Sequence, residues 1–98
     1  MQSVEKKLVI YNWKLSAAVD SSTNEEVDFP EILLIFNSDG NVEIEKSDGT
    51  RFISQWNTLQ DDKYLQIGNN IYKINSLTHK ILSLRYGTID IYYLPVDK

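Results

Sequence analysis

The chain contains no cysteine, two prolines and one histidine, and its apolar residues never form a long run. Without cysteine it has no disulfides, no thiolate nucleophile and no cysteine-ligated metal site. A bilayer-spanning helix needs roughly 18 apolar residues in succession, and no segment approaches that length. His79 stands beside Lys80 without the other ligands of a transition-metal site, so we interpret it as a solvated turn residue.

Basic residues are also few: Lys and Arg total 10 against 14 for Asp and Glu, giving a formal charge of -4. Nucleic-acid binders displace counterions with a basic stripe, so this balance argues against a nucleic-acid partner. The carboxylates between Asp20 and Asp28 lack the spacing of an EF-hand calcium loop. Other acidic pairs lack the apolar surroundings that acid–base catalysis requires. The sequence therefore predicts a protein that is not an enzyme and holds no cofactor or metal.

Ninety-eight residues, 42% of them hydrophobic, predict one domain over 1–98 with a single core. The first seven residues are polar and contain no apolar core of a secretory signal. Two expectations for the compartment stay open. The chain is cytoplasmic if it is full-length, and periplasmic or an envelope lipoprotein if Met1 replaces a removed leader.

All four glycines fall at breaks between apolar runs, and two of these breaks share the same residues, Ser38-Asp39-Gly40 and Ser47-Asp48-Gly49. Asp-Gly between alternating hydrophobics is a strong hairpin signal, because glycine accepts the positive φ of the turn. Between the breaks, alternation of apolar and polar residues predicts about eight short strands. They cover 11–17, 31–37, 42–45, 51–56, 64–67, 71–75, 82–86 and 89–94.

The remaining segments complete this prediction. Residues 2–10 are compatible with one helical turn or with an early strand, residues 20–28 form the longest polar loop, and Pro95 ends the last strand. Short junctions favour an antiparallel meander. Closure of the meander removes its exposed edges, so we expect an all-β, eight-stranded up-and-down barrel.

A set of short segments follows one another in a characteristic order along 11–95. They are Trp13-Lys14-Leu15, Leu34 to Val42, Trp56, Leu65-Gln66-Ile67, Tyr72-Lys73-Ile74, Leu77-Thr78, Leu82-Ser83-Leu84 and Tyr92-Tyr93-Leu94. In this order the chain resembles the small lipocalin-like domains common in Bacteroidetes-type bacteria, many of them envelope lipoproteins. The resemblance implies the same barrel and binding of a small apolar molecule. Tyr11 departs from the family pattern, which has glycine two residues before the first-strand tryptophan.

The inward face of such a barrel carries large side chains. The expected set is Trp13, Leu15, Ile32, Leu34, Phe36, Val42, Ile44, Phe52, Trp56, Leu65, Ile67, Tyr72, Ile74, Leu82, Leu84 and Tyr93. An eight-stranded barrel is just wide enough for side chains to fill it, or to hold one small ligand. The volume of these side chains favours a filled core with at most a shallow mouth.

The leading hypothesis is a non-catalytic binding module that takes a small apolar or aromatic molecule at one barrel mouth. Its expected walls are Trp13, Phe36, Trp56 and Tyr72, with hydroxyls from Tyr86 and Tyr93. Because Tyr92 and Tyr93 are adjacent in a strand, they are expected to face opposite sides. The alternative is a protein-interaction or cell-envelope scaffold domain with a packed barrel. Its unknown partner would meet the outer tyrosines and the 20–28 loop.

Overall fold

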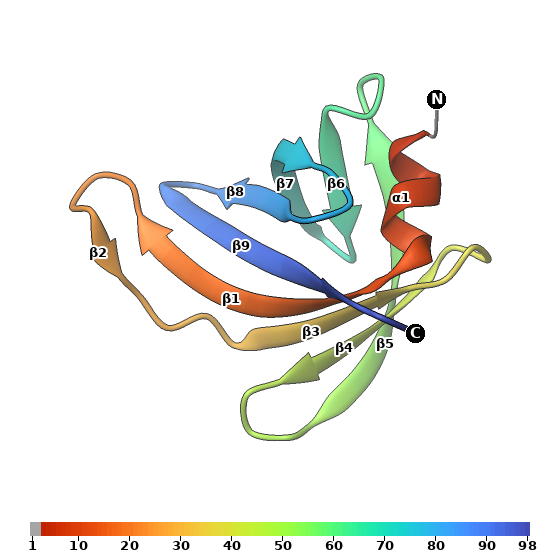
Figure 1. Cartoon of the computed structure of the whole chain (residues 1–98), viewed down its shortest axis with the longest axis horizontal. Coiled ribbons are helices and arrows are strands. Elements are labelled where there is room, and N and C mark those ends of the chain that lie inside the picture. The colour runs from red at the N-terminus through yellow and green to blue at the C-terminus, as the bar shows by residue number, and fades with distance from the viewer. Residues whose placement is uncertain (1–2) are drawn as a thin grey trace.

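The structure is a computed structural model that describes residues 3–98 as one short helix and nine strands (Figure 1). The first two residues of the expected domain, which include the start of the ambiguous 2–10 segment, lie outside the described residues. The elements are α1 (Val4–Ile10), β1 (Asn12–Asp20), β2 (Glu25–Glu26), β3 (Glu31–Phe36), β4 (Asn41–Lys46), β5 (Arg51–Leu59), β6 (Tyr64–Ile67), β7 (Asn70–Leu77), β8 (Leu82–Tyr86) and β9 (Ile89–Val96).

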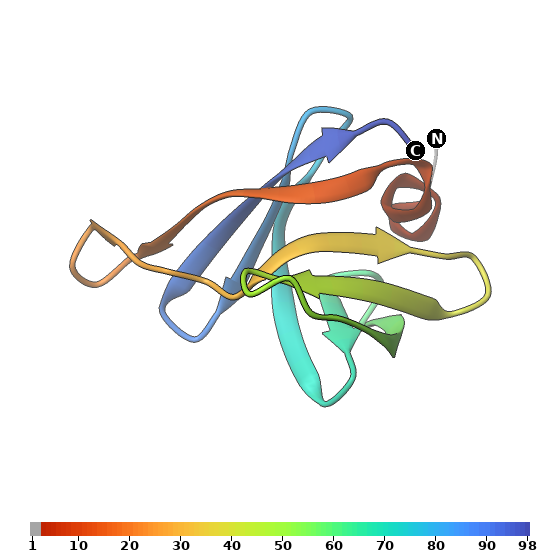
Figure 2. The same ribbon diagram turned by 90° about the horizontal axis from the view of Figure 1, so that it is seen from below.

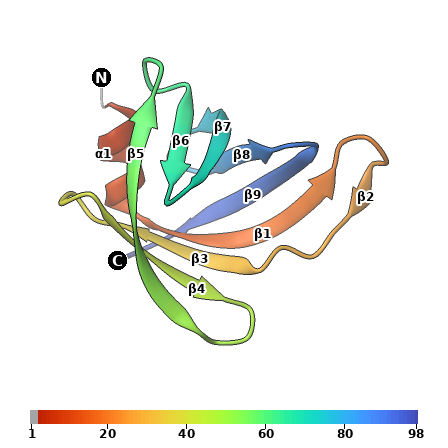
Figure 3. The same ribbon diagram turned by 180° about the vertical axis from the view of Figure 1, so that it is seen from behind.

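Strands β3 to β9 pair antiparallel in chain order, β3 also pairs with β1, and β1 closes the ring by pairing with β9. The β1–β9 ladder is long, from Asn12 opposite Val96 to Asp20 opposite Ile89. Figure 3 shows β5 as a long curved strand that joins β4 on one side to β6 on the other. The expected eight-stranded meander barrel is thus confirmed, and the two-residue β2 adds a ninth strand to the β1 edge.

The 20–28 segment is more ordered than the expected polar loop. Glu25 and Glu26 pair with Asp20 and Val19, so this segment continues β1 as a short hairpin. The turn is held locally, because the Asp20 carboxylate accepts a hydrogen bond from the Ser22 backbone amide at 2.9 Å. The sequence pattern missed it because both β2 residues are charged and exposed.

The last strand does not end before Pro95, as expected, but continues through it to Val96. The pairing of β8 with β9 stops at Leu82 opposite Tyr93. Beyond that point β9 has only β1 beside it, with Trp13 opposite Pro95. A residue without an N–H is tolerated where a strand has only one neighbour. Strands β5 and β7 also run further than predicted, to Leu59 and Leu77.

The register shifts in β1, β3 and β7, and the shifts in β1 and β3 change which of the expected residues face the barrel interior. In β1 the register shifts between Leu15 and Ala17, so Ala18 is buried where simple alternation placed Ala17 inside. In β3 it shifts between Glu31 and Leu33, which leaves Ile32 as the extra residue and puts Glu31 opposite Lys46. Glu31 therefore has the facing expected for Ile32.

Helix α1 settles the two alternatives for its segment in favour of a helix. The Ser3 hydroxyl caps it by accepting a hydrogen bond from the Lys6 amide at 3.2 Å. Figure 2 shows α1 at one end of the barrel, at the same end as the C-terminus and the β3–β4 turn. Its Leu8 is fully buried, and the Leu8 carbonyl accepts a hydrogen bond from the Trp13 indole at 3.0 Å. The helix thereby closes this end of the barrel.

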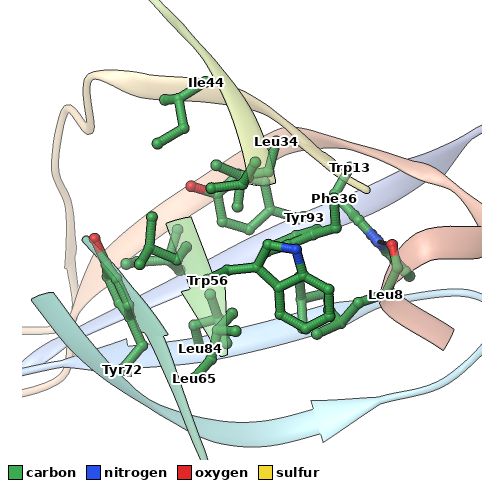
Figure 4. Close-up of a cluster of buried hydrophobic side chains, with 14 residues drawn as sticks. Leu8, Trp13, Leu34, Phe36, Ile44, Trp56, Leu65, Tyr72, Leu84 and Tyr93 are labelled. Carbon is green, nitrogen blue, oxygen red and sulfur yellow. Dashed lines mark hydrogen bonds between the residues drawn. The ribbon is translucent and has the colours of Figure 1, made fainter. Parts of the chain in front are cut away.

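The core runs through the barrel from Leu8 of α1 to Tyr72 (Figure 4). Its buried cluster comprises Leu8, Trp13, Leu34, Phe36, Val42, Ile44, Trp56, Leu65, Ile67, Tyr72, Leu82, Leu84, Ile91 and Tyr93. Of the expected inward residues, Leu15 and Ile74 pack only partly buried against this cluster. Phe52 departs further, since 41% of its surface is exposed. The filled-core expectation therefore describes one end of the barrel better than the other.

Candidate functional site

A cavity of about 380 Å³ opens at the barrel end away from α1. Its lining consists of Glu31, Leu34, Ile44, Phe52, Ser54, Ile67, Gly68, Asn69, Asn70, Tyr72, Leu84 and Tyr93. Figure 4 shows Tyr72 and Leu8 on opposite sides of the core cluster, so the cavity and the helical plug lie at opposite ends. The barrel is therefore packed at one end and hollow at the other.

The inner wall of the cavity is apolar. Leu34 and Ile44 face each other across the β3–β4 ladder, and both are buried. Ile67 and Leu84 complete this wall from β6 and β8. These strands supply inward residues at every second position, as the alternation of the sequence predicted. A ligand here would bury apolar surface against a preformed floor.

Two tyrosines bring hydroxyl groups to the cavity. The Tyr93 hydroxyl donates a hydrogen bond to the Glu31 backbone oxygen at 2.8 Å. Burial raises the pKa of Tyr93 well above its ordinary value. Burial, and then the nearby charge of Glu31, raises the pKa of Tyr72 to about 12. Both phenols are neutral at physiological pH and can therefore act as hydrogen-bond donors.

The rim is built by the β6–β7 turn and by β5. The Gly68 amide donates to the Gln55 carbonyl at 2.8 Å, which ties this turn to β5. Gly68 has a φ of +59°, and a Cβ there would lie 2.9 Å from the Ser54 hydroxyl oxygen. Glycine therefore allows both the left-handed turn and the close approach. Asn69 and Asn70 follow it on the rim.

The structure separates the expected site residues into two groups. Tyr72 and Tyr93 both line the cavity. Tyr86 stacks on Tyr72 with ring centroids 5.1 Å apart, and its hydroxyl donates to the Asn70 side-chain oxygen at 3.3 Å. Tyr86 has the same facing as the inward Leu82 and Leu84, so it lies beside Tyr72 at the mouth of the cavity, where 43% of its surface is exposed.

The other three expected residues do not reach the cavity. Trp13 and Phe36 are completely buried near α1. Trp56 packs edge-to-face on Phe36 at 5.3 Å and donates its indole N–H to the Asn37 carbonyl at 3.0 Å. Trp56 instead lines a depression of about 200 Å³ against α1. Tyr92 and Tyr93 face opposite sides of the strand, as expected, because Tyr93 is buried and Tyr92 is only half-buried.

Sequence reasoning missed the polar residues of the cavity. Ser54 carried a signal, as a small polar residue on an inward face between Phe52 and Trp56. Asn69 and Asn70 were recognised only as turn residues. Glu31 carried no local signal, because the bulge at Ile32 alone turns it toward the interior.

A wider recess of about 770 Å³ lies between β1 and the segment that precedes β3. It exists because the β1–β3 ladder contains only two pairs, which end at Lys14 opposite Leu33. Its β1 side is formed by Leu15 and the small residues Ser16, Ala17 and Ala18. We assign the candidate site to the barrel cavity, where buried apolar groups and tyrosine hydroxyls converge.

Other kinds of site find no support in residues 3–98. No three His, Cys, Asp or Glu side chains gather there in a way that could hold a metal ion. No helix in this part of the chain has the length and apolar character needed to cross a membrane.

The comparisons with known proteins agree with the barrel. No protein-family model and no curated protein matches the chain. A solved lipocalin-like protein from Bacteroides uniformis superposes with a TM-score of 0.72 at 12% identity, covering 91% of this chain and 99% of that one. An uncharacterized protein from Bacteroides eggerthii gives 0.67 at 14% identity, over 90% and 99%. At these identities the likeness shows the fold, which is lipocalin-like.

Proposed function

We propose that the protein is a non-catalytic binding module that holds a small molecule with an apolar or aromatic body in the barrel cavity. One observation carries the proposal: the end opposite α1 contains a cavity of about 380 Å³ with an apolar floor. Small-molecule sites commonly occupy about 300–1,000 Å³, with apolar walls and a few converging polar groups. The cavity has both properties.

The state of its polar groups supports binding rather than catalysis. A general acid or base works best when its pKa lies near the working pH. The pKa of Tyr72 is instead raised to about 12, and burial also raises that of Tyr93. The neutral Tyr72 hydroxyl can orient a ligand by donating a hydrogen bond, whereas the Tyr93 hydroxyl, which already donates to the Glu31 backbone oxygen, can accept one. The lipocalin-like fold adds support by analogy, because eight-stranded barrels of this type can hold one small ligand.

Titration calorimetry with 1-naphthalenemethanol tests the proposal, since this neutral aromatic alcohol is small enough for the cavity. We expect saturable binding at one site. Ser54→Leu extends a side chain into the cavity and should weaken binding about tenfold or more. Gln55→Leu is the matched control, because the neighbouring Gln55 is exposed on the outer face and should leave the affinity unchanged.

Absence of saturable binding to the folded wild-type protein would contradict the proposal. The packed scaffold domain, with partners on its outer surface, would then be the better account. Equal weakening by Ser54→Leu and Gln55→Leu would also count against it, because the ligand would then sit elsewhere.

A further inference from the structure

We propose that the cavity prefers ligands that carry a cationic ammonium group on their apolar body, with Glu31 as the counter-charge. This inference rests on the proposed function, since it concerns the same cavity. Glu31 is the only residue of the described lining that carries a formal charge at pH 7. A single carboxylate at the mouth of an otherwise neutral cavity gives the site one sign of charge.

The bulge in β3 is what places this carboxylate. Leu33 and Ile35 pair with Glu45 and Glu43, and these residues share the outer face of the barrel. Continued alternation would put Glu31 on that face too. The extra residue at Ile32 reverses the facing, so Glu31 lines the cavity together with Leu34. Bulges are known to redirect individual side chains near binding sites.

The Glu31 carboxylate forms no ion pair within 4 Å among the described residues. In residues 3–98 the ion pairs are Arg51 with Glu45 and Arg85 with Asp90. The cation closest in register is Lys46, opposite Glu31 in the β3–β4 ladder. Its ammonium lies 5.3 Å from the centroid of the Phe52 ring and does not form an ion pair with Glu31 among these residues. A ligand ammonium can therefore take a place that no described basic group occupies.

The hydrogen bonds leave the carboxylate available as well. Tyr93 donates to the backbone oxygen of Glu31 and not to its side chain. No other described residue donates a hydrogen bond to the carboxylate. Phe52, Tyr72 and Tyr93 line the same cavity, and aromatic rings attract cations that lie over their faces, as Lys46 does at Phe52. Carboxylate and rings thus favour the same class of ligand.

Three nearly isosteric probes test the charge preference: 1-naphthalenemethylamine, which is an ammonium at pH 7, the neutral 1-naphthalenemethanol, and 1-naphthoate. In the wild type we expect the amine to bind about tenfold more tightly than the alcohol, because hydrogen bonds to charged groups are stronger than neutral ones. Naphthoate should bind most weakly, since its charge is repelled by Glu31. Added salt should weaken only the amine.

Glu31→Gln keeps the shape of the side chain and removes its charge. It should bring the amine and the alcohol to within about twofold of each other, with little change for the alcohol. Glu43→Gln removes the same charge from the outer face of β4 and should preserve the tenfold preference. If Glu31→Gln does not fold, the salt dependence of the two wild-type affinities decides the question.

The outcomes separate this inference from the proposed function. Binding of the alcohol with no preference for the amine, or a preference that survives Glu31→Gln, overturns the inference and leaves the binding module standing. A preference for naphthoate overturns it in the same way and assigns the dominant charge to Lys46. Failure of all three probes to bind overturns the proposed function itself.

Discussion

The two ends of the barrel are built from the same kinds of residue but differ in what covers them. At the closed end α1 inserts Leu8, and both indole N–H groups donate to backbone carbonyls, Trp13 to Leu8 and Trp56 to Asn37. At the open end no helix of the described chain covers Tyr72 and Tyr93, and their hydroxyls share a cavity with Glu31. Whether an inward aromatic residue becomes part of the core or part of a cavity wall therefore depends on whether a helix closes its end of the barrel.

This difference between the two ends explains why only some of the expected site residues line the cavity, while the others lie in the core near α1. The alternation of the strands correctly placed Trp13, Phe36 and Tyr72 on the inner face. Facing, however, does not say at which height of the barrel a side chain lies or whether that end is capped. The helix that closes this end is N-capped by Ser3 and brings one buried residue, Leu8, which no strand pattern could indicate.

The largest expected effect compares one substitution at the two ends. Phe36→Ala removes a fully buried ring and should lower the free energy of unfolding by about 3–5 kcal/mol. Phe52→Ala removes a ring that is 41% exposed and should cost about 1 kcal/mol or less. Urea unfolding of both variants measures the contrast. Equal losses would show that the two ends are packed alike.

The second effect is a loss of folding stability at alkaline pH, caused by the ionisation of Tyr72 at the open end. The pKa of Tyr72 is raised to about 12, whereas an unfolded tyrosine ionises near its ordinary value of 10.0. Between these values only the unfolded state loses the proton, so stability is full below about pH 10 and falls as the pH rises. The slope is at most about 1.4 kcal/mol per pH unit for one such group.

Tyr72→Phe removes this contribution. Unfolding measured between pH 8 and pH 12 should show a shallower alkaline loss in the variant than in the wild type. Identical profiles would mean that Tyr72 is not held neutral by its surroundings.

A smaller effect concerns the hydrogen bond that ties β9 to β3 across the cavity. Tyr93→Phe keeps the ring and removes the donor to the Glu31 carbonyl, which should cost about 1 kcal/mol. Tyr86→Phe, at the exposed mouth of the cavity, should cost less than about 0.5 kcal/mol. A thermal unfolding series ranks the two variants, and the reverse order would contradict the assignment of Tyr93 to the structured wall.

The smallest effect tests features that the two ends share. Asp39 and Asp48 lie in the β3–β4 and β4–β5 turns, and each accepts a hydrogen bond at 2.9 Å from the amide two residues later. Because both turns are exposed, Asp39→Ala and Asp48→Ala should each cost about 1 kcal/mol or less, and by similar amounts. A loss of several kcal/mol at one turn would show that its hairpin is coupled to one end of the barrel.

The sequence was sufficient for features that depend on local chemistry. The Asp-Gly turns, the alternating faces of β4 and the inward position of Tyr93 all follow from neighbours in the chain. The bulges at Ser16 and Ile32 could not be predicted, because their register is set by pairing with β9 and β4. Because Glu31 owes its orientation to the bulge at Ile32, the sequence did not indicate the charged residue of the site.

The most direct test of the account is a titration of the folded protein with 1-naphthalenemethanol, followed by its backbone amide resonances. The account predicts saturable shifts concentrated at the open end, at Gly68, Asn69 and Tyr72, with little change at Leu8 and Trp13. Shifts centred on Trp56 and α1, or no saturable shifts, would contradict a binding cavity at the open end of the barrel.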